Sequence, residues 1–579
     1  MTIFAGILGR RHDSLSDSTR RALTTSLSRD PRDQVQVFGG AHWCCAKLDI
    51  GAFARDGHLL TDGALSLLAG EPLLQDGGGA GTRDADLAVL HRDCEQGTLA
   101  GLRAATGAFT LVHLRPSDRR VVLIADKLGL RPLYYSVTTD FVIFATAMRI
   151  LESLPGFDRT MDLRGMTEVT AFEYPLGDRT PYANVRRIHA AEVVDVDASS
   201  IRQSVYWRWD DIPVSTDAPE LLAQRAHAAF VGGVKRRLAG ARSATAFLSG
   251  GLDSRAVVGS LVSEGVEVRT FNFARRGTQD HFLGASMAES FGTAHHEYEK
   301  PEGARTPNYS EMMATAVRDA GGQNDPATSP RTVWSGEGGS VVLGHVHMHR
   351  PVVERLRSGN EEGAFDEFFD REDIRIPLKM FTTSVARSVA RLVRDGVHKE
   401  LMQLSGVEPG RRFHMFLLVN DQRRKLTRHF EDIDRHRLEW QLPFFDSAFV
   451  ASVLAVPLDL CLEHRFYTSW FEQFDPIVRS VPWQSYPGHD PCPLPVPATL
   501  SYQWDSHYQA AERAAQKREV IARARNLLFA ADFPRPLLSR SRVAVAAALH
   551  ASGARNYEYA LNAAALCHRY WRECEGRWA

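Results

Sequence analysis

Six consecutive residues near the middle of the chain have the composition of a phosphate-binding turn: Ser249-Gly250-Gly251-Leu252-Asp253-Ser254. Adjacent glycines allow a backbone to approach an anion closely, and a helix that begins at such a turn points unpaired N–H groups at phosphate oxygens. The turn lacks the Gly-Lys-Ser/Thr ending of Walker sequences, so no lysine is placed for transfer of a γ-phosphoryl group. We therefore expect an enzyme that uses ATP and cleaves it between the α and β phosphates.

The segments on both sides of this turn have the patterns of a strand and a helix. Residues 245–248 are a short apolar run, and apolar residues after the turn recur at helical spacing until Gly265. Residues 266–273 are rich in β-branched and aromatic side chains, which predicts a second strand and a βαβ unit with a parallel sheet. In such a sheet the ligand crevice lies at the C-terminal ends of the strands. An ordinary glycine-rich turn, in which Asp253 and Ser254 cap the helix, stays open as the alternative.

Together with this turn, several further segments resemble the synthetase domain of the asparagine synthetase group, which activates carboxylates as acyl-adenylates and releases pyrophosphate. In chain order they are Phe271-Asn272-Phe273, Asp280, residues 291–297, Ser335-Gly336-Glu337-Gly338-Gly339 and Pro443-Phe444-Phe445-Asp446. Residues 1–8 and 126–135 are similar to the glutamine amidotransferase domain that precedes the synthetase domain in that family. The resemblance covers most of residues 1–490.

The resemblance implies an α/β chain with two main domains. An N-terminal domain of layered β-sheets, similar to Ntn amidotransferases, is expected at residues 1–205, and a linker at residues 206–219. Residues 220–579 are then a doubly wound parallel-sheet domain of the ATP-pyrophosphatase (adenine nucleotide α-hydrolase-like) type, which ends in a helical C-terminus. The residue pattern agrees, since short strands with turn signals fill the first part and helical periods prevail after Glu220.

The resemblance also assigns roles to residues in these segments. The expected ATP-binding residues are Leu248, Ser249, Gly250, Gly251, Leu252, Asp253, Ser254, Asn272, Asp280, Ser335 and Gly336. Asp253 and Glu337 are the expected catalytic residues, and the resemblance places Glu337 beside the adenylate. A partly desolvated carboxylate is suited to take a proton from an attacking ammonium group. A capping or ion-paired role for Glu337 stays open.

Magnesium is the expected companion of ATP, and Asp253 is its candidate protein ligand. Ser340 stands where the synthetases place a metal-binding aspartate, and Val341 replaces the acid that follows. A magnesium ion is commonly coordinated mostly by phosphate oxygens and water, so the site can lose one protein ligand and still bind it. The sequence leaves the remaining protein ligands open.

Position 2 departs from the family pattern in a way that bears on the reaction. The glutaminase of that family attacks glutamine with a cysteine at position 2, whereas this chain has Thr2. Threonine can act as an N-terminal nucleophile, but the glutaminase chemistry passes through a thioester, so we expect no working glutaminase. The attacking amine must then come from elsewhere, and an amine on the substrate itself is the simplest source. Two groups of relatives without that cysteine, β-lactam synthetases and lasso peptide cyclases, both close rings from an internal amine.

A proline-rich segment, residues 481–493, favours the second of these two groups. It is similar to a block of lasso peptide cyclases and falls where asparagine synthetases carry a lysine-bearing segment near the adenylate. Its prolines and aromatic side chains suit an irregular wall in contact with a peptide. The expected peptide-binding residues are Trp483, Gln484, Tyr486 and His489. A surface loop without a catalytic part is the open alternative.

The resemblance therefore predicts a lasso peptide cyclase, a lasso macrolactam synthetase of the asparagine synthetase and β-lactam synthetase family. ATP would adenylate the side-chain carboxylate of an Asp or Glu in a ribosomally made core peptide, with release of pyrophosphate. The N-terminal amine of the peptide would then displace AMP and close the ring. The precursor core peptide is the expected partner, and a leader peptidase and a leader-recognition protein join it where the pathway uses them. The alternatives are a small-molecule amide synthetase, of the ammonia-dependent asparagine synthetase or β-lactam synthetase type, and a relative without catalytic activity.

Composition and charge argue against several other classes of protein. The 579 residues include 69 basic and 70 acidic side chains, so no overall field draws the chain to nucleic acid or to an anionic membrane. No run of about 18 apolar residues occurs, which predicts no membrane insertion and a cytoplasmic location. The 7 cysteines are odd in number and lack C-x-x-C spacing, so we expect reduced thiols rather than a disulfide framework or structural zinc.

Three histidines alternate with apolar residues in a short segment after the second glycine-rich run. His345, His347 and His349 share one face if the segment is a strand. A metal site and a polar face near the mouth of the active site both stay open for them. The polar face is favoured, because no carboxylate or cysteine stands close by in the sequence.

Overall fold

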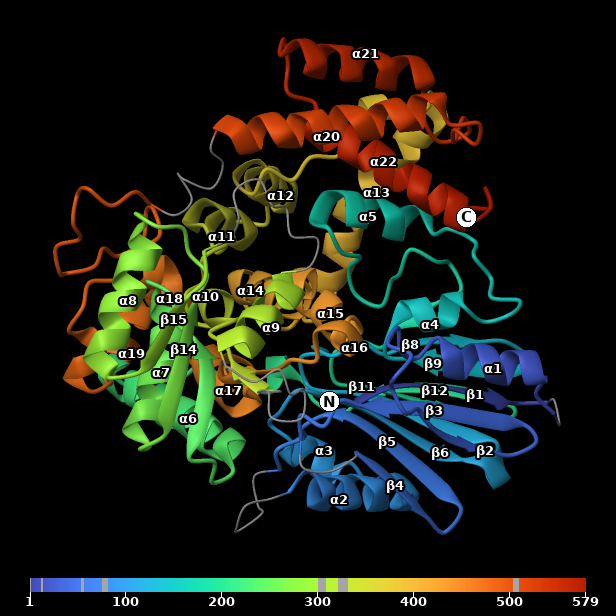
Figure 1. The fold of residues 1–579 in the computed structure, drawn as a ribbon, viewed down its shortest axis with the longest axis horizontal. Coiled ribbons are helices and arrows are strands. Elements are labelled where there is room, and N and C mark those ends of the chain that lie inside the picture. The colour runs from blue at the N-terminus through green and yellow to red at the C-terminus, as the bar shows by residue number, and fades with distance from the viewer. Residues whose placement is uncertain are drawn as a thin grey trace. The chain divides into compact units, whose positions relative to one another are not determined.

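The computed structural model describes residues 2–11, 14–53, 57–74, 82–299, 309–320, 332–502 and 510–579. The chain forms two compact units that each combine separate stretches of sequence. Unit 1 consists of Met1–Pro155, Ile188–His349 and Leu417–Ser506, and unit 2 of Gly156–Arg187, Arg350–Phe416 and His507–Ala579. Figure 1 traces the chain from the blue strands near its N-terminus to the red helices near its C-terminus.

The first part of unit 1 contains two antiparallel sheets. One runs in the order β8-β9-β1-β3-β2 and the other in the order β12-β11-β7-β6-β5-β4. The strands are β1 (Thr2–Gly9), β2 (Gln36–Gly39), β3 (Trp43–Asp49), β4 (His58–Thr61), β5 (Ala64–Gly70), β6 (Phe109–Arg115), β7 (Arg120–Ala125), β8 (Tyr134–Val137), β9 (Phe141–Ala145), β11 (Glu192–Val196) and β12 (Ile201–Val205). A core of buried side chains from both sheets, among them Phe4, Val112, Leu123 and Phe144, lies between them. The predicted layered β-sheet domain is thus confirmed (Figure 1).

The second part of unit 1 is built on a parallel sheet in the order β15-β14-β13-β16-β17. Its strands are β13 (Ser243–Phe247), β14 (Glu267–Asn272), β15 (Ala294–Glu297), β16 (Thr332–Trp334) and β17 (Glu439–Gln441). The chain adds strands on one side of β13 and then returns to add β16 and β17 on the other side, which is the doubly wound order. In sheets of this kind the ligand crevice lies where the order reverses, at the C-terminal ends of the two central strands. The predicted doubly wound fold is confirmed, and it directs attention to the ends of β13 and β16.

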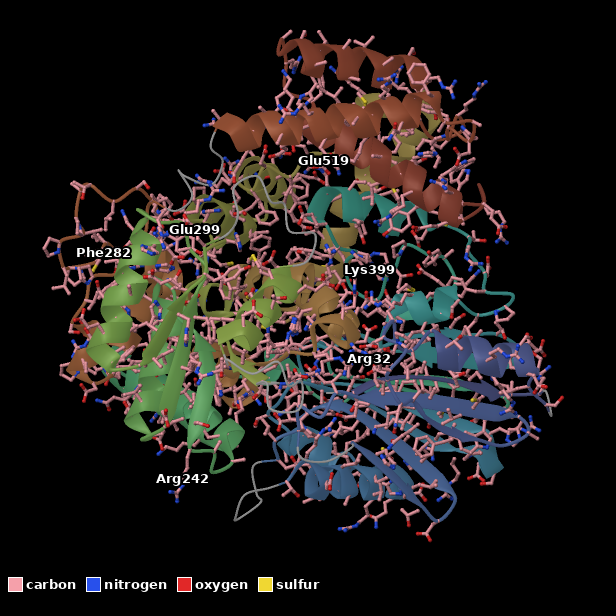
Figure 2. The ribbon with its side chains drawn as sticks, viewed as in Figure 1. Arg32, Arg242, Phe282, Glu299, Lys399 and Glu519 are labelled. Atoms are coloured by element: carbon pink, nitrogen blue, oxygen red, sulfur yellow. The ribbon has the colours of Figure 1, made fainter. Side chains whose placement is uncertain are left out.

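Local signals in the sequence set the limits of the helix that follows β14. Thr278 caps the N-terminus of this helix, α8, and its hydroxyl accepts a hydrogen bond from the backbone N–H of His281. Gly292 ends the helix with a φ of 68°, a left-handed conformation that glycine adopts without steric cost. At the N-terminal end of β13, the central strand, Figure 2 shows the exposed Arg242 side chain projecting away from the protein.

Helices connect and cover the sheets of unit 1, with α6 packed against α7, α17 and α19. The helices of this unit are α1 (Asp17–Thr25), α2 (Arg83–Gln96), α3 (Ala100–Ala104), η1 (Pro116–Asp118), α4 (Met148–Glu152), η2 (Trp209–Asp211), α6 (Pro219–Leu238), α7 (Leu252–Ser263), α8 (Gln279–Phe291), α9 (Tyr309–Ala320), α10 (Gly339–Val342), α15 (Arg423–Glu431), α16 (Ile433–His436), η4 (Pro443–Phe445), α17 (Ser447–Leu454), α18 (Leu458–Cys461), η5 (Leu462–His464), α19 (Arg465–Phe471) and η6 (Pro476–Arg479). In addition, α14 (Pro409–Asn420) runs from unit 2 into unit 1.

Unit 2 is mainly helical, as expected for the C-terminal part of the chain. Its elements are α5 (Leu163–Phe172), β10 (Arg186–Arg187), α11 (Arg350–Arg357), α12 (Glu361–Arg371), η3 (Leu378–Met380), α13 (Thr383–Met402), α20 (Ala510–Phe529), α21 (Arg540–Ser552) and α22 (Glu558–Glu573). Within this unit α20 packs against both α21 and α22, and α13 packs against α5. In the buried centre, Arg179 donates a hydrogen bond to Glu168, which neutralises a carboxylate that has no exposure to solvent.

Buried polar contacts join the antiparallel sheets to the parallel sheet within unit 1. Arg131 pairs with Glu439 at 2.5 Å, and the Glu439 carboxylate is fully buried. The amide Nε2 of Gln441 donates to Glu71 at 2.9 Å. Both partners on the parallel sheet, Glu439 and Gln441, belong to β17, so this edge strand contacts residues next to the antiparallel sheets.

In the described part of the chain, no single helix combines the length and apolar composition needed to cross a membrane. The segments Ser447–Leu454 and Leu458–Phe471 reach that composition only together, and they meet at a bend of 108°. Their side chains Phe449, Val453 and Trp470 are buried inside unit 1.

Candidate functional site

The turn between β13 and α7 is held in shape by bonds within the protein. The N–H of Ser249 donates to the hydroxyl of Ser254 at 2.9 Å, and the N–H of Gly250 donates to the Asp280 carboxylate at 2.7 Å. Gly251 is the N-cap of α7 and has no side chain that could accept hydrogen bonds from the first turn. The first N–H groups of a helix lack partners within the helix, so the first turn of α7 remains the part of this loop that is open to an anion.

Two of the expected ATP-binding residues, Asn272 and Asp280, lie beneath the turn. Nδ2 of Asn272 donates to the backbone carbonyl of Asp280 at 3.1 Å, and its Oδ1 accepts from Ala274 N–H at 2.7 Å. Burial raises the pKa of the Asp280 carboxyl, although the bond from Gly250 N–H acts in the opposite direction. In this structure both side chains shape the turn, and direct contact with a nucleotide stays a prediction for them.

The second glycine-rich run lies at the end of β16 and fits closely against α7. An ideal Cβ placed on Gly336 would lie 2.5 Å from the backbone nitrogen of Ser254, and one on Gly339 would lie 2.5 Å from Cγ of Asp253. Gly338 has a φ of 96°, and a Cβ there would meet the ring of Phe445 at 2.5 Å. Real Cβ atoms do not approach so closely, so the run is glycine-rich because its backbone packs directly against Asp253 and Ser254 of α7 and against Phe445.

Asp253 lies at the centre of this arrangement. Its Oδ2 accepts a hydrogen bond from the Ser340 hydroxyl at 2.6 Å, and its Oδ1 accepts one from the Tyr467 hydroxyl. Burial raises the pKa of the Asp253 carboxyl, the two hydroxyl donors act against this, and the nearby Glu337 carboxylate adds to the rise. Ser340, predicted as the site of a lost metal ligand, therefore serves as a hydrogen-bond donor to the remaining carboxylate.

Tyr467 is a part of the site that the sequence did not indicate. It lies on α19, 214 residues after Asp253 in the chain, and its side chain is buried. The contact with Asp253, in turn, raises the pKa of the Tyr467 hydroxyl, although burial contributes more. Its sequence surroundings contain no motif, so only the folded chain reveals its place.

Glu337 is half-buried at the tip of the second turn. Its backbone N–H donates to the Ser335 hydroxyl at 3.1 Å, which fixes the peptide that carries the side chain. Its carboxylate contributes to raising the pKa of both Asp253 and Tyr486, so it lies close to each of them. The structure therefore brings the two expected catalytic carboxylates together.

Of the four expected peptide-binding residues, Gln484 contacts the same turn directly. The N–H of Gln484 donates to the carbonyl of Gly250 at 3.1 Å, and the buried Oε1 of Gln484 has no hydrogen-bond partner among the described residues. Trp483 is buried, with its ring 5.5 Å from that of Phe471. Burial raises the pKa of the Tyr486 hydroxyl to about 12, although a hydrogen bond with the Ser340 side chain opposes the rise.

His489, the last of these four, forms a small aromatic cluster with residues of η5 and the wall segment. Its ring lies 4.3 Å from that of His464 and 5.9 Å from that of Tyr486. The Nδ1 of His489 donates to the Pro487 carbonyl at 3.3 Å, and burial lowers the pKa of the ring. His464 is more deeply buried, which lowers its pKa to about 3. His489 of the wall and His464 of η5 therefore form a pair of imidazoles that are neutral at neutral pH.

The histidine-rich segment is not a strand, so the condition under which its three histidines would share one face is not met. His345 has a φ of 51°, and its Nδ1 donates to the Leu343 carbonyl at 2.8 Å. The N–H of Met348 donates to the His345 carbonyl at 2.8 Å, which closes a turn. His345, Val346 and Met348 are all buried in this turn, so the three histidines do not form one exposed polar face. Among the described residues, no group of three or more His, Cys, Asp and Glu side chains could hold a metal ion.

Position 2 lies in a buried polar network at the start of β1. The Thr2 hydroxyl donates to the Asp49 carboxylate at 2.6 Å and accepts a bond from Arg83 at 2.9 Å. The Arg83 guanidinium also donates to the carbonyls of Leu68 and Gly70. The Thr2 oxygen is therefore held by a carboxylate and a guanidinium, and its side chain is buried.

Comparison with known families and proteins gives two domain matches in chain order. Residues 74–207 match the glutamine amidotransferase domain, and residues 226–467 match asparagine synthase. The chain is 24% identical over 204 residues to the glutamine-hydrolysing asparagine synthetase 3 of Bacillus subtilis, a match that covers 31% of this chain and 32% of the relative. It is 24% identical over 309 residues to the glutamine-hydrolysing asparagine synthetase of Rattus norvegicus, covering 47% of this chain and 52% of the relative.

The matched region therefore spans about half or less of the length of these relatives. Among solved structures, the chain is similar to the glutamine phosphoribosylpyrophosphate amidotransferase from B. subtilis, with a TM-score of 0.23 and 13% identity. That match covers 48% of this chain and 67% of the other.

Proposed function

We propose that this chain is an AMP-forming, ATP-dependent ligase of the asparagine synthetase family that makes amide bonds, and its two domain matches support this. The observation that carries the proposal is the first turn of α7, which no side chain of Gly251 caps and which the carboxylates of Asp253 and Glu337 flank. A helix N-terminus binds the oxygens of a pyrophosphate group through its N–H groups. The orphaned Oε1 of Gln484, next to this turn, supports a ligand that offers a donor there.

The reaction follows from these positions. An oxygen of the substrate carboxylate attacks the α phosphorus of ATP, and the bond to the β phosphate breaks as pyrophosphate leaves to the first turn of α7. The nitrogen of an amine then attacks the acyl carbon, and the bond from this carbon to the AMP oxygen breaks. The proton of the resulting ammonium passes to Glu337, whose partly buried carboxylate is suited to accept it.

Magnesium fits the site with one protein ligand. Both oxygens of Asp253 accept a hydrogen bond, from Ser340 and from Tyr467, and each oxygen keeps a further lone pair. The ion would be held by Asp253 together with phosphate oxygens and water, an arrangement that this ion commonly adopts. When bound, it would neutralise charge on the phosphates.

We propose further that the amine belongs to the substrate itself, and that the product is the macrolactam of a lasso peptide. Two features support this choice. Residue 2 is a threonine, so no thiol stands at that position to release ammonia from glutamine. The oxygen of Thr2 is already hydrogen-bonded to Asp49 and Arg83. The proline-rich residues 481–493 lie beside the turn, as a wall for a peptide requires. The expected substrate is a precursor core peptide that offers an Asp or Glu carboxylate and its own α-amine.

The entropic cost of closing the ring is small compared with the cost of ordering the threaded peptide chain. Closing a loop of about eight residues costs about 2 kcal/mol. Holding about ten tail residues in a threaded conformation costs about 1 to 2 kcal/mol for each residue, which the enzyme surface must offset. A peptide-specific enzyme therefore needs far more contact area than one that binds a single amino acid.

A small-molecule amide synthetase is the competing function, and the names of the relatives favour it. Both curated relatives are asparagine synthetases by name, and neither similarity distinguishes a peptide carboxylate from that of aspartate. The wall residues and Thr2 are the features that the competing function leaves without a role.

Exchange of labelled pyrophosphate into ATP tests both functions. We expect exchange with a linear peptide that carries a free N-terminal amine and an Asp or Glu at the ring-closing position, and no exchange with aspartate or a β-amino acid. Exchange with aspartate or a β-amino acid alone would replace the macrolactam proposal with the competing one. If no carboxylate supports exchange, or if turnover yields ADP and orthophosphate, the ligase proposal itself is wrong.

A further inference from the structure

Arg255 is an unusual residue to find one turn inside a phosphate-binding helix. It is the fourth residue of α7, and its side chain has no exposure to solvent. A cation near the N-terminus of a helix opposes the helix dipole, and burial of a guanidinium adds a cost of desolvation. Burial lowers the pKa of Arg255 to about 10, so the group stays charged at neutral pH.

The partners of this buried cation are backbone carbonyls. Nη1 donates to the carbonyl of Val481 at 2.6 Å and reaches that of Val478 at 3.5 Å, and Nη2 donates to that of Pro482 at 2.8 Å. Among the described residues, no carboxylate pairs with Arg255. An apolar side chain of similar length would fill the same space without a buried charge, so packing alone does not account for the guanidinium.

The segment that Arg255 holds is the start of the wall, residues 481–493. Four prolines in this segment have no N–H to donate, so it cannot be anchored by the ladder of a sheet. The planar guanidinium offers five donors in a fixed geometry and can hold several carbonyls at once. Two residues further along, the N–H of Gln484 donates to the carbonyl of Gly250.

The wall is therefore attached to the turn between β13 and α7 on both sides: at Gly250 within the turn and at Arg255 just after it. We propose that Arg255 is a positioning residue that fastens the wall to this turn, so that the peptide-facing segment and the pyrophosphate-binding turn keep one geometry. The inference rests on the proposed function for the identity of the ligands, but its test requires only a nucleotide.

The test compares backbone hydrogen exchange in residues 481–493 with and without the non-hydrolysable probe α,β-methylene-ATP and magnesium. In the full-length wild-type protein, the nucleotide should slow exchange in the wall by about tenfold, because it stabilises the turn to which the wall is bonded. Arg255→Lys keeps the positive charge but loses the planar guanidinium that holds several carbonyls at once. In this variant the slowing should fall to about twofold or less. A role in packing alone would raise exchange equally with and without nucleotide.

Arg237→Lys is the matched control. Arg237 is also a buried arginine of unit 1, but it pairs with Asp446 and has no contact with the wall among the described residues. This variant should retain the nucleotide-dependent protection. If Arg255→Lys does not fold, Gln484→Pro removes the N–H that bonds Gly250 and should abolish the protection in the same way.

The outcomes separate the inference from the proposed function. Protection of the wall that persists in Arg255→Lys, or that is absent from wild-type protein with nucleotide bound, overturns the inference and leaves the ligase proposal intact. Failure of wild-type protein to bind α,β-methylene-ATP overturns the proposed function itself.

Discussion

Gly251 is the position at which nucleotide binding and folding can be separated. Its φ of −85° and ψ of −179° are an extended conformation that alanine also adopts. An ideal Cβ on this residue would meet only the Ser249 hydroxyl, at 3.5 Å, which is an ordinary contact. The fold can therefore accommodate Gly251→Ala. The new methyl group would, however, stand beside the N–H groups that we expect to bind pyrophosphate.

The expected effects on stability nearly cancel. Loss of chain freedom in the unfolded state stabilises a Gly→Ala variant by about 0.4 to 1 kcal/mol. Alanine is a poorer N-cap than glycine and costs about 0.5 to 1 kcal/mol. The melting temperature should then change by less than about 4 °C. Nucleotide binding loses one charge-assisted hydrogen bond of about 1.5 to 3 kcal/mol, so affinity should fall about 10- to 100-fold.

Titration calorimetry with magnesium and α,β-methylene-ATP, together with thermal melting, would measure both effects. Gly336→Ala is the contrasting variant, because its Cβ would lie 2.5 Å from the Ser254 nitrogen. It should lose affinity and also about 1 to 3 kcal/mol of stability through overpacking. Gly406→Ala, where a Cβ would meet nothing within 4 Å, should leave the affinity unchanged and raise stability by no more than about 0.4 to 1 kcal/mol.

Two results would refute this reasoning. Wild-type affinity in Gly251→Ala would mean that the phosphates do not lie at the first turn of α7. A loss of stability as large as that of Gly336→Ala would mean that Gly251 is required by the fold rather than by a ligand.

Three further variants test other parts of the site and of its support. In metal-free buffer, Asp253→Asn should match or exceed wild-type stability at neutral pH, because burial raises the pKa of the Asp253 carboxyl and disfavours its charged form. This advantage should be largest above the raised pKa and vanish as the pH falls toward the usual aspartate value; an advantage that grows in acid during urea unfolding would contradict it. Glu337→Gln should reduce amide formation more than pyrophosphate exchange, and equal losses would remove its role as proton acceptor. Arg131→Met should cost about 3 to 5 kcal/mol in urea unfolding, because the fully buried Glu439 loses its partner, and Arg131→Met with Glu439→Leu should recover most of it.

The local parts of the fold could be predicted from the sequence because their signals are local. The strand expected at residues 245–248 is observed as Ser243–Phe247, and the one expected at residues 266–273 as Glu267–Asn272. The position of β16 beside β13 could not be derived from residue patterns, since no periodicity records which strands pair. The resemblance to a known family placed Glu337 beside the adenylate, but it did not say which strands pair.

The residues of the site also fall into those that the sequence indicated and those that it did not. Glycine-rich turns and the wall segment carry short signals, and the structure brings Asp253, Glu337 and Gln484 to one place. Tyr467 and Arg255 carry no such signal, because each acts through one contact with a residue far away in the chain. The alternation of histidines with apolar residues at 345–349 did not correspond to a strand, because the backbone turns at His345, which is itself buried.

The two glycine-rich runs look alike in sequence, but the structure explains the presence of glycine differently at different positions. Gly336 and Gly339 are required by contact with α7, and Gly250 by the approach of Asp280, whose Cα would lie 2.8 Å from an added Cβ. These constraints exist without any ligand. Gly251 has no comparable contact among the described residues, so the fold does not require a glycine there, and we attribute its small size to the anion proposed to bind at the first turn of α7. A phosphate at this turn is therefore indicated by Gly251 itself more than by the number of glycines around it.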